Sequence, residues 1–337
     1  MSKEYRGVWI FAEQRDGDMQ KVSLELVGKG REIADKLGEK LTAVLLGYEV
    51  GNLSKTLIEY GADEVIVVDN QYLKKYTTDG YAKVMCDLIM DKKPEILFIG
   101  ASYLGRDLGP RVAAILKTGL TADCTSLDIE EATGNLLMTR PAFGGNLMAT
   151  IECPNHRPQM STVRPGVFIV PCVDERRVGT IHKVETDLLE EDIRAKVVEV
   201  VKSLKDKVDL TEADIIVSGG RGVGSKEGFE LLNKLAEALG GTIGGSRAVI
   251  DAGVLDKHLQ VGQTGKTVRP KIYVACGISG AIQHLAGMQE SEYIIAINKD
   301  DAAPIMKVAD LAVVGDLYKI IPEMIKEINA NKFSCKL

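Results

Sequence analysis

The sequence predicts an α/β protein of two domains, each an α/β sandwich built around a parallel sheet. Short apolar runs alternate with segments of helical periodicity, as they do in successive βαβ units. A charged stretch at residues 185–209 interrupts this alternation. The 337 residues are enough for two domains that each bury a core of their own. We therefore expect an N-terminal domain over residues 1–205 and a C-terminal domain over residues 206–337.

The N-terminal domain begins with four expected strands, at residues 8–12, 41–46, 65–69 and 96–100. Between the first two strands, a helix that ends at Gly38 carries one apolar face, formed by Val22, Leu26, Ile33 and Leu37. Parallel strands need crossover connections of this length. The pattern therefore indicates a parallel sheet covered by helices.

Between residues 119 and 173 the pattern changes to short strands with turn signals, one of them at residues 143–146. Alternating apolar positions predict a hairpin or a β extension at the edge of the sheet: Leu136, Met138, Leu147 and Ala149. Pro154 and Pro158 should confine the strands of this region to edge positions, because proline donates no ladder hydrogen bond. This half of the chain has no obvious phosphate-binding loop, and we expect no cofactor of its own in the N-terminal domain.

The C-terminal domain restarts the βαβ pattern and is expected to be Rossmann-like and doubly wound. Its strands are expected at residues 215–218, 272–276, 294–297 and 311–314, with helices at 229–240 and 317–328. Each strand is followed by glycine or by a polar turn residue. Ligands of open α/β sheets bind at these carboxyl ends of the strands.

Composition excludes several classes of function. The net charge of −6 and the absence of a dense basic block argue against a nucleic-acid partner. No apolar run approaches the roughly 20 residues of a membrane helix, so we expect no membrane insertion. The six cysteines show no C-x-x-C spacing, which argues against zinc and iron–sulfur sites and for reduced thiols. The N-terminus shows no targeting signal, and by exclusion we expect a cytoplasmic protein.

Two glycine-rich loops follow strands and precede helices, at residues 219–224 and 277–280. The first, G-G-R-G-V-G, could offer amide hydrogens to a pyrophosphate, although a plain tight turn explains its spacing as well. Arg221 favours a ligand, because a cation there could pair with a phosphate or lie against a flavin ring. In the second loop, Ser279 either caps a helix or, with Gly280, contacts a pyrophosphate or ribityl chain. Together the two loops favour a bound dinucleotide.

Other polar residues near these loops each have a structural and a functional interpretation. Thr264 either bonds to its own backbone or donates to a ring nitrogen. His284 is either an ordinary helix residue or a ligand contact at the strand ends. Arg247, after an expected diglycine turn, is either solvated or close to a ligand. Asn298 and Asp316 stand at strand ends, where they contact ribose or adenine or cap local structure.

These residues closely resemble the alpha subunit of electron-transfer flavoproteins. In the C-terminal half the resemblance is carried by G-G-R-G (219–222), G-G-S-R-A (244–248), V-G-Q-T-G-K (261–266), G-I-S-G-A-I-Q-H-L-A-G-M (277–288), A-I-N-K-D (296–300), A-P-I (303–305) and V-A-D (308–310). In the N-terminal half it is carried by W-I-F-A-E (9–13), G-R-D-L-G-P-R-V-A (105–113) and T-V-R-P-G (162–166). The resemblance covers nearly the whole chain.

The resemblance implies a heterodimer with a beta subunit, in which a flavin-binding C-terminal domain holds FAD. It implies an N-terminal domain that is nucleotide-hydrolase-like and forms a partner interface. The implied FAD contacts are Arg221, Ser246, Arg247, Val261, Gly262, Gln263, Thr264, Ser279, Gly280, Ala281, Ile282, Gln283, His284, Asn298, Asp316 and Leu317. Within the family, Thr264 would face flavin N5, His284 the C2 carbonyl and Arg247 the ring. No metal site is implied.

The implied activity is a one-electron shuttle between an acyl-CoA dehydrogenase and another redox partner, without a substrate site of its own. Arg247 and a hydrogen bond from His284 would stabilise the negative charge that a flavin gains with one electron. A charge-assisted hydrogen bond of about 1.5 to 3 kcal/mol would move a one-electron potential by about 65 to 130 mV, at about 59 mV per tenfold change. Some family members instead bifurcate electrons from NADH to ferredoxin and an enoyl-CoA. The alternative is a regulatory or docking protein that binds a dinucleotide without redox turnover.

Overall fold

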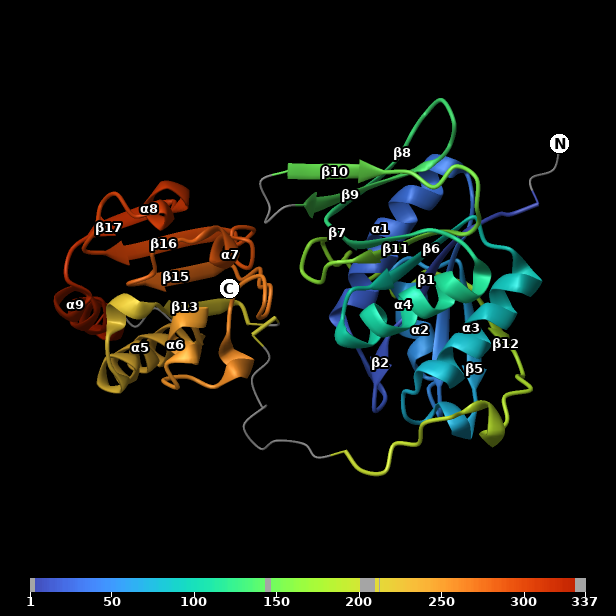
Figure 1. Ribbon diagram of the computed structural model, residues 1–337, viewed down its shortest axis with the longest axis horizontal. Coiled ribbons are helices and arrows are strands. Elements are labelled where there is room, and N and C mark those ends of the chain that lie inside the picture. The colour runs from blue at the N-terminus through green and yellow to red at the C-terminus, as the bar shows by residue number, and fades with distance from the viewer. Residues whose placement is uncertain (1–3, 143–146, 201–209, 212, 331–337) are drawn as a thin grey trace. The chain divides into compact units, whose positions relative to one another are not determined.

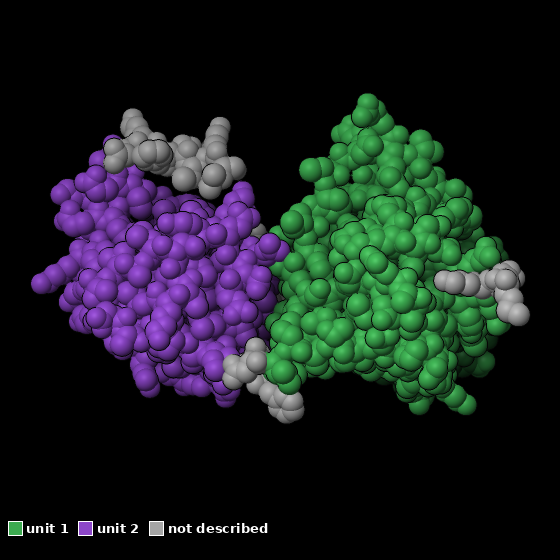
Figure 2. All heavy atoms as spheres, turned by 90° about the horizontal axis from the view of Figure 1, so that it is seen from above, with its two compact units in different colours: residues 1–200 green, residues 201–337 purple. Residues whose placement is uncertain are grey.

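A computed structural model describes residues 4–142, 147–200, 210–211 and 213–330 (Figure 1). It divides the chain into two compact units, residues 1–200 and 201–337, which Figure 2 shows in different colours. The domain boundary expected between residues 205 and 206 lies outside the described residues, as does the turn expected at 143–146.

The first unit is built on a seven-stranded sheet in the order β12-β5-β4-β1-β6-β11-β7, with every neighbouring pair parallel. The strands are β1 (Val8–Ala12), β4 (Leu41–Gly47), β5 (Glu64–Asp69), β6 (Ile96–Gly100), β7 (Leu120–Cys124), β11 (Gln159–Val163) and β12 (Thr180–Lys183). A two-stranded ribbon, β2 (Gln14–Arg15) and β3 (Asp18–Met19), follows β1. The four strands expected at the start of the chain are therefore confirmed.

Helices cover both faces of this sheet: α1 (Lys21–Leu37), α2 (Leu53–Glu59), α3 (Thr78–Lys92) and α4 (Tyr103–Leu116). Successive residues of β1 face opposite ways, so Ile10 belongs to the core under α1 and α2, whereas Phe11 belongs to the core under α3 and α4. The expected end of α1 is confirmed, since Gly38 adopts the left-handed conformation at its C-terminus.

Short antiparallel strands form the predicted hairpin region: β8 (Ser126–Ile129), β9 (Leu136–Ala142) and β10 (Leu147–Ile151). The expectation that prolines keep all strands of this region at edges is wrong for β11, which lies between β6 and β7 and is fully buried. Pro158 precedes the first residue of β11, so its missing N–H interrupts no hydrogen bond of the ladder.

The second unit is built on a five-stranded parallel sheet in the order β14-β13-β15-β16-β17. Its strands are β13 (Ile215–Gly219), β14 (Thr242–Gly245), β15 (Ile272–Cys276), β16 (Tyr293–Asn298) and β17 (Leu311–Val314). The chain runs from β13 to β14 on one side and then returns to β15 on the other. The strand order therefore reverses between β13 and β15, as in doubly wound folds, which confirms the expected fold class.

Two apolar cores enclose this sheet. One face is covered by the amphipathic helices α5 (Lys226–Leu239) and α9 (Leu317–Ala330), with the short helix α6 (Arg247–Asp251) beside them (Figure 1). The other face is covered by α7 (Ile282–Leu285), α8 (Pro304–Val308) and the loop that contains Val261 and Val268. Short 3-10 turns are η1 (Gln71–Leu73) and η3 (Glu190–Asp192) in the first unit, and η4 (Arg221–Val223) and η5 (Lys257–Leu259) in the second.

The described part of the chain contains no helix that is both long and apolar enough to cross a membrane. Within the same residues, no three histidine, cysteine or acidic side chains are grouped as metal ligands would be. The described cysteines are free, and Cys86, Cys124 and Cys276 are buried. Burial raises the pKa of each of these three thiols to about 12, so they are unreactive at neutral pH.

Candidate dinucleotide site

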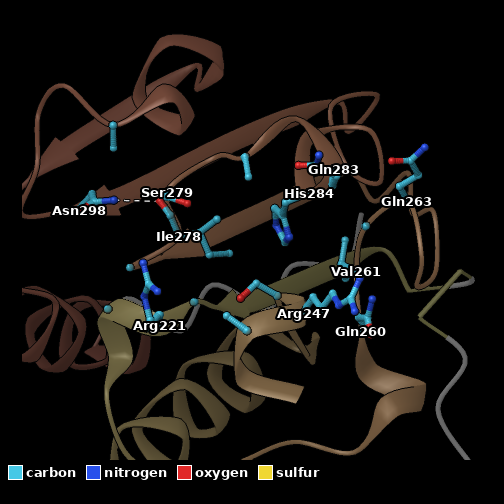
Figure 3. Close-up of a pocket in the computed structure, with 18 of the residues that line it drawn as sticks. Arg221, Arg247, Gln260, Val261, Gln263, Ile278, Ser279, Gln283, His284 and Asn298 are labelled. Atoms are coloured by element: carbon cyan, nitrogen blue, oxygen red, sulfur yellow. Dashed lines mark hydrogen bonds between the residues drawn. The ribbon is translucent and has the colours of Figure 1, made fainter. Parts of the chain in front are cut away.

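A cavity of about 570 Å³ opens at the carboxyl ends of β13 and β15, where the strand order of the second unit reverses (Figure 3). It is lined by Gly220, Arg221, Gly222, Ser246, Arg247, Ala248, Gln260, Val261, Gly262, Gln263, Thr264, Gly277, Ile278, Ser279, Ala281, Gln283, His284, Asn298, Asp300 and Ala303. Such switch points are where doubly wound sheets bind nucleotides.

The first glycine loop meets the second by direct backbone contact. The Gly220 amide donates to the Cys276 carbonyl at 2.9 Å, and the Gly222 amide donates to the Gly277 carbonyl at 3.0 Å. A Cβ at Gly220 would lie 2.3 Å from the Gly277 oxygen, so a side chain there would force the loops apart. For Gly220 and Gly222 the structure therefore favours the alternative of a tight turn, because the protein itself accepts the hydrogens of these two amides.

The second glycine loop, at residues 277–280, leaves backbone amides unpaired within the described part of the chain, as was expected of the first loop. The amides of Ser279, Gly280 and Ala281 donate to no acceptor among the described residues. Gly280 has a φ of 84°, and a Cβ there would lie 2.3 Å from the nitrogen of Ile305. Ser279 does not cap α7, whose N-cap position is Ala281. The loop thus presents unpaired amide hydrogens beside the cavity, which suits an anionic ligand.

Two arginines lie on the side of the cavity opposite Ser279 and His284 (Figure 3). Arg221, in η4, makes no ion pair or side-chain hydrogen bond with any described residue, whereas Arg247 pairs with Asp251 at 3.3 Å. The Arg247 side chain is 68% exposed. The diglycine before it is not the turn that was expected, because Gly244 and Gly245 end strand β14. Both cations are thus available to a ligand at little desolvation cost.

His284 is buried, with 6% of its surface exposed. Its Nε2 lies 3.0 Å from the hydroxyl of Tyr273, and its Nδ1 is buried without a partner of hydrogen-bonding geometry. Burial lowers the pKa of His284 to about 4, and the nearby carbonyl of Val261 opposes only part of this effect. The imidazole is therefore neutral at pH 7, so it offers a neutral hydrogen bond and no positive charge.

The loop at residues 260–264 supplies a hydroxyl and an amide side chain to the cavity. The Gln260 side chain donates from Nε2 to the Thr264 hydroxyl at 2.9 Å. Thr264 does not bond to its own backbone, and its hydroxyl hydrogen stays available to a ligand. The loop is anchored to α7, since the Gln263 amide donates to the Gln283 carbonyl at 2.7 Å.

The structure brings together around the cavity most of the residues that the sequence singled out. These are Arg221, Ser246, Arg247, Val261, Gly262, Gln263, Thr264, Ser279, Ala281, Gln283, His284 and Asn298. Asn298 is also held in place structurally, because its Nδ2 donates to the Ile278 carbonyl at 2.8 Å.

Four predicted residues do not line the cavity. Gly280 contacts α8 instead, and Ile282 is partly exposed elsewhere on α7. The Asp316 carboxylate accepts from the Tyr318 amide at 3.1 Å at the start of α9, which is a helix cap. Leu317 is buried in the core under α5 and α9. For Asp316 the structure shows the cap, one of its two expected roles, and Leu317, which only the resemblance implied, is a core residue; whether either contacts FAD stays a prediction.

Sequence reasoning missed several residues of the site. Gln260, Asp300 and Ala303 line the cavity, and Tyr273 bonds to His284 from beneath it. Gln260 directly precedes the V-G-Q-T-G motif, and Asp300 closes the motif A-I-N-K-D, so the motifs themselves could have indicated both residues as part of the site. Tyr273 carried none, because a tyrosine inside a buried strand looks like an ordinary core residue.

The fold and the site together define a dinucleotide-binding protein: a doubly wound sheet, a cavity at its switch point, cations on one side and unpaired amides on the other. Comparison with known proteins gives the family. A model described as the electron transfer flavoprotein domain matches residues 8–189, and one described as the electron transfer flavoprotein FAD-binding domain matches residues 209–289.

Curated relatives agree over nearly the full length. The chain is 64% identical to the electron transfer flavoprotein subunit alpha of Clostridium acetobutylicum, over 97% of this chain and 98% of that protein. It is 53% identical to the acryloyl-CoA reductase electron transfer subunit beta of Anaerotignum propionicum, over 97% of each chain. It is 43% identical to the subunit LctC of a lactate dehydrogenase (NAD(+),ferredoxin) of Acetobacterium woodii, over 96% of this chain and 77% of that protein. The chain belongs to the alpha-subunit family of electron transfer flavoproteins.

The residues of the cavity fit FAD, the cofactor of this family. Among the described residues, the buried Nδ1 of His284 has no partner in hydrogen-bonding geometry, Arg221 has no counter-ion, and the amides from Ser279 to Ala281 have no acceptor. A phosphate-bearing ligand with a polar ring system would satisfy all three. Which of the predicted residues contact FAD stays a prediction.

The switch point of the first unit, at the carboxyl ends of β1 and β6, carries a buried acidic side chain, unlike that of the second unit. At the switch point between β1 and β6, the Glu13 side chain is 1% exposed and accepts hydrogen bonds from Ser102 and Arg15. A buried carboxylate with two hydrogen-bonding partners therefore follows β1 at this switch point.

Proposed function

We propose that this chain, paired with a beta subunit, holds FAD in the cavity of its second unit and passes electrons singly between an acyl-CoA dehydrogenase and another redox partner. The chain is an alpha subunit of the electron transfer flavoprotein family, and FAD is its cofactor. The observation that supports the site is the cavity at the β13/β15 switch point, with Arg221 and the amides of residues 279–281 left unpaired around it by the described part of the chain.

Each group around the cavity has a role that follows from its chemistry. Arg221 and the amides from Ser279 to Ala281 would hold the phosphates by charge and by hydrogen bonds. Thr264 and His284 would donate hydrogen bonds to polar atoms of the ring system, and Arg247 would lie against it as a positive charge. When bound, FAD supplies the capacity to accept and release one electron at a time. Arg247 and the hydrogen bonds from Thr264 and His284 would stabilise the negative charge that this electron adds.

The proposed dehydrogenase partner rests on one relative's name, which links that protein to acryloyl-CoA reductase. A second candidate function, electron bifurcation from NADH to ferredoxin, is favoured by the relative whose name pairs NAD(+) with ferredoxin. The two candidates differ in how much flavin the heterodimer holds. Bifurcation requires a second FAD in the beta subunit, whereas a simple carrier holds one.

We further propose that the first unit binds no nucleotide of its own and serves as a partner surface. At the β1/β6 switch point, Ser102 and Arg15 already donate hydrogen bonds to the buried Glu13 carboxylate, so these donors are not free for a phosphate. The non-redox alternative, a regulatory or docking protein, has no feature of its own in the described residues that favours it.

The site is tested by co-expressing the chain with its beta subunit and measuring FAD content and affinity. Arg221→Gln should weaken FAD binding at least tenfold, because a charge-assisted hydrogen bond contributes about 1.5 to 3 kcal/mol. Lys226→Gln is the matched control: Lys226 begins α5, five residues on, and lies outside the cavity. If both variants keep wild-type affinity, the cavity is not the FAD site.

Redox function is tested by stepwise dithionite reduction of the heterodimer with visible absorption. Two one-electron steps that separate in the wild type and merge in Arg247→Gln support the carrier. Two FAD per heterodimer and rapid bleaching by NADH support bifurcation, whereas one FAD with AMP opposes it. A bound nucleotide that dithionite does not reduce would support the docking alternative.

A further inference from the structure

Tyr273 places a hydroxyl inside an apolar core. It lies in β15 with none of its surface exposed, among buried residues such as Ile216, Ala296 and Ile305. It does not line the cavity. Burying an unpaired hydroxyl costs about 1 to 3 kcal/mol, which phenylalanine at the same position would avoid. The Tyr273 hydroxyl therefore depends on its partner, the Nε2 of His284 at 3.0 Å.

The direction of this hydrogen bond follows from what surrounds the hydroxyl. Burial raises the pKa of Tyr273, so the phenol keeps its hydrogen. Within the described residues, the Nε2 of His284 is the one atom in hydrogen-bonding geometry with it. The Ser218 hydroxyl is near enough to oppose part of this rise in the Tyr273 pKa, but its buried Oγ is not in hydrogen-bonding geometry with any described residue. The Tyr273 hydrogen therefore points to Nε2, which accepts it with its lone pair.

This direction decides the tautomer of His284. A neutral imidazole carries one hydrogen, and a nitrogen that accepts a hydrogen bond cannot also carry it. The hydrogen is therefore on Nδ1, which has no partner in hydrogen-bonding geometry among the described residues, although the Val261 carbonyl lies near the ring. The ring belongs to the lining of the cavity, whereas Tyr273 does not. His284 is thus fixed as a donor by a residue behind it.

We propose that Tyr273 is a positioning residue that holds neutral His284 with its hydrogen on Nδ1, making this histidine an obligate hydrogen-bond donor to the cofactor. The proposal rests on the proposed function in one respect, namely that the cavity holds FAD. In the opposite tautomer, Nδ1 would present a lone pair to an atom that becomes more electron-rich on reduction. Tyr273 thus favours the reduced cofactor without touching it.

The tautomer is measured directly by nitrogen NMR of the heterodimer labelled with ¹⁵N-histidine, with and without FAD. The signal of His284 is assigned by its loss in His284→Gln. We expect a neutral ring with hydrogen on Nδ1 in the wild type and a mixture or reversal in Tyr273→Phe. Ser218→Ala, which removes the neighbouring hydroxyl but leaves the Tyr273–His284 bond, should keep the wild-type tautomer. A wild type with hydrogen on Nε2, or a Tyr273→Phe signal equal to the wild type, would overturn the proposal.

The effect on the cofactor is measured as the first one-electron equilibrium of bound FAD. Tyr273→Phe should disfavour reduction about two- to tenfold, the range of one hydrogen bond. In a His284→Gln background the same change should have no further effect, because the tautomer no longer exists to be fixed. An equal effect in both backgrounds would mean that Tyr273 acts through core packing, and the proposal would be wrong. If the wild-type heterodimer bound no FAD, the proposed function would fail, while the NMR measurement would still decide the Tyr273–His284 pair.

Discussion

The contact between the two glycine loops predicts that Gly220→Ala destabilises the second unit even when no cofactor is bound. The added Cβ would lie 2.3 Å from the Gly277 oxygen and 2.7 Å from the Ile278 Cα. These atoms are backbone and cannot rotate away. Carbon needs roughly 3.5 Å from such neighbours, so the loops must separate by about 1 Å.

The magnitude follows from the groups that separate. Overpacking of this kind costs about 1 to 3 kcal/mol. The hydrogen bonds from Gly220 to Cys276 and from Gly222 to Gly277 are stretched as well, at about 1 kcal/mol each. Together the change should cost about 3 to 5 kcal/mol, which is at least a 100-fold shift at about 1.4 kcal/mol per factor of ten.

The assay is hydrogen–deuterium exchange of the heterodimer after FAD is removed, followed by mass spectrometry of peptides. Peptides of β13 and β15 should exchange at least about 100-fold faster in Gly220→Ala, whereas those of β1 in the first unit should not change. Gly224→Ala separates steric contact from backbone strain, because Gly224 has a φ of 80° but a Cβ added there would meet no described atom within 4 Å. It should cost only about 1 to 2 kcal/mol. Wild-type exchange in cofactor-free Gly220→Ala, combined with weaker FAD binding, would show that the loop serves the ligand and not the packing.

Three further predictions follow from the site. Asp316→Ala should destabilise the second unit by about 1 kcal/mol through loss of the α9 cap, measured by urea unfolding, with unchanged FAD affinity; a large loss of affinity would restore Asp316 as a contact. His284 has a folded pKa of about 4 against an unfolded value near 6.5. Between these two pH values the unfolded chain binds more protons, so the free energy of unfolding should fall by roughly 3 kcal/mol as pH drops from 6.5 to 4. His284→Gln should lack this part of the pH dependence, and an equal slope in both proteins would contradict the lowered pKa of His284. Asp251→Asn should raise the one-electron potential by about 10 to 40 mV, since an exposed ion pair contributes about 0.2 to 1 kcal/mol, and a lower potential measured by dye equilibration would exclude Arg247 as the stabilising charge.

Long apolar runs made the sheet strands predictable. β1 and β6 are buried on both faces, as strands of parallel sheets are, and each reads as an unbroken apolar segment. β14 was missed because two of its four residues are glycine, which indicates a turn when neighbours are ignored. The interior place of β11 depends on pairing with β6 and β7, distant segments that local patterning does not reveal.

The lining of the cavity was predictable for residues at or just after the carboxyl end of a strand, as Arg221, Ser279 and Asn298 are. Asp316 stands at the same kind of position, yet its carboxylate accepts from the amide of Tyr318. The amides of the first glycine loop could not be assigned either, because their acceptors lie in the second loop, more than fifty residues further along the chain. Composition and motif spacing do not reveal a hydrogen-bond partner that is distant in the sequence.

The cavity is lined by segments that follow β13, β14, β15 and β16, together with the loop at residues 260–264. No continuous fragment contains them all except nearly the entire second unit. Retention of the cofactor and integrity of this unit are therefore a single equilibrium. Free FAD at about 100 times its dissociation constant adds about 2.7 kcal/mol to the free energy of unfolding. Without free FAD this contribution is lost, and a larger fraction of the chain would be unfolded and open to proteolysis.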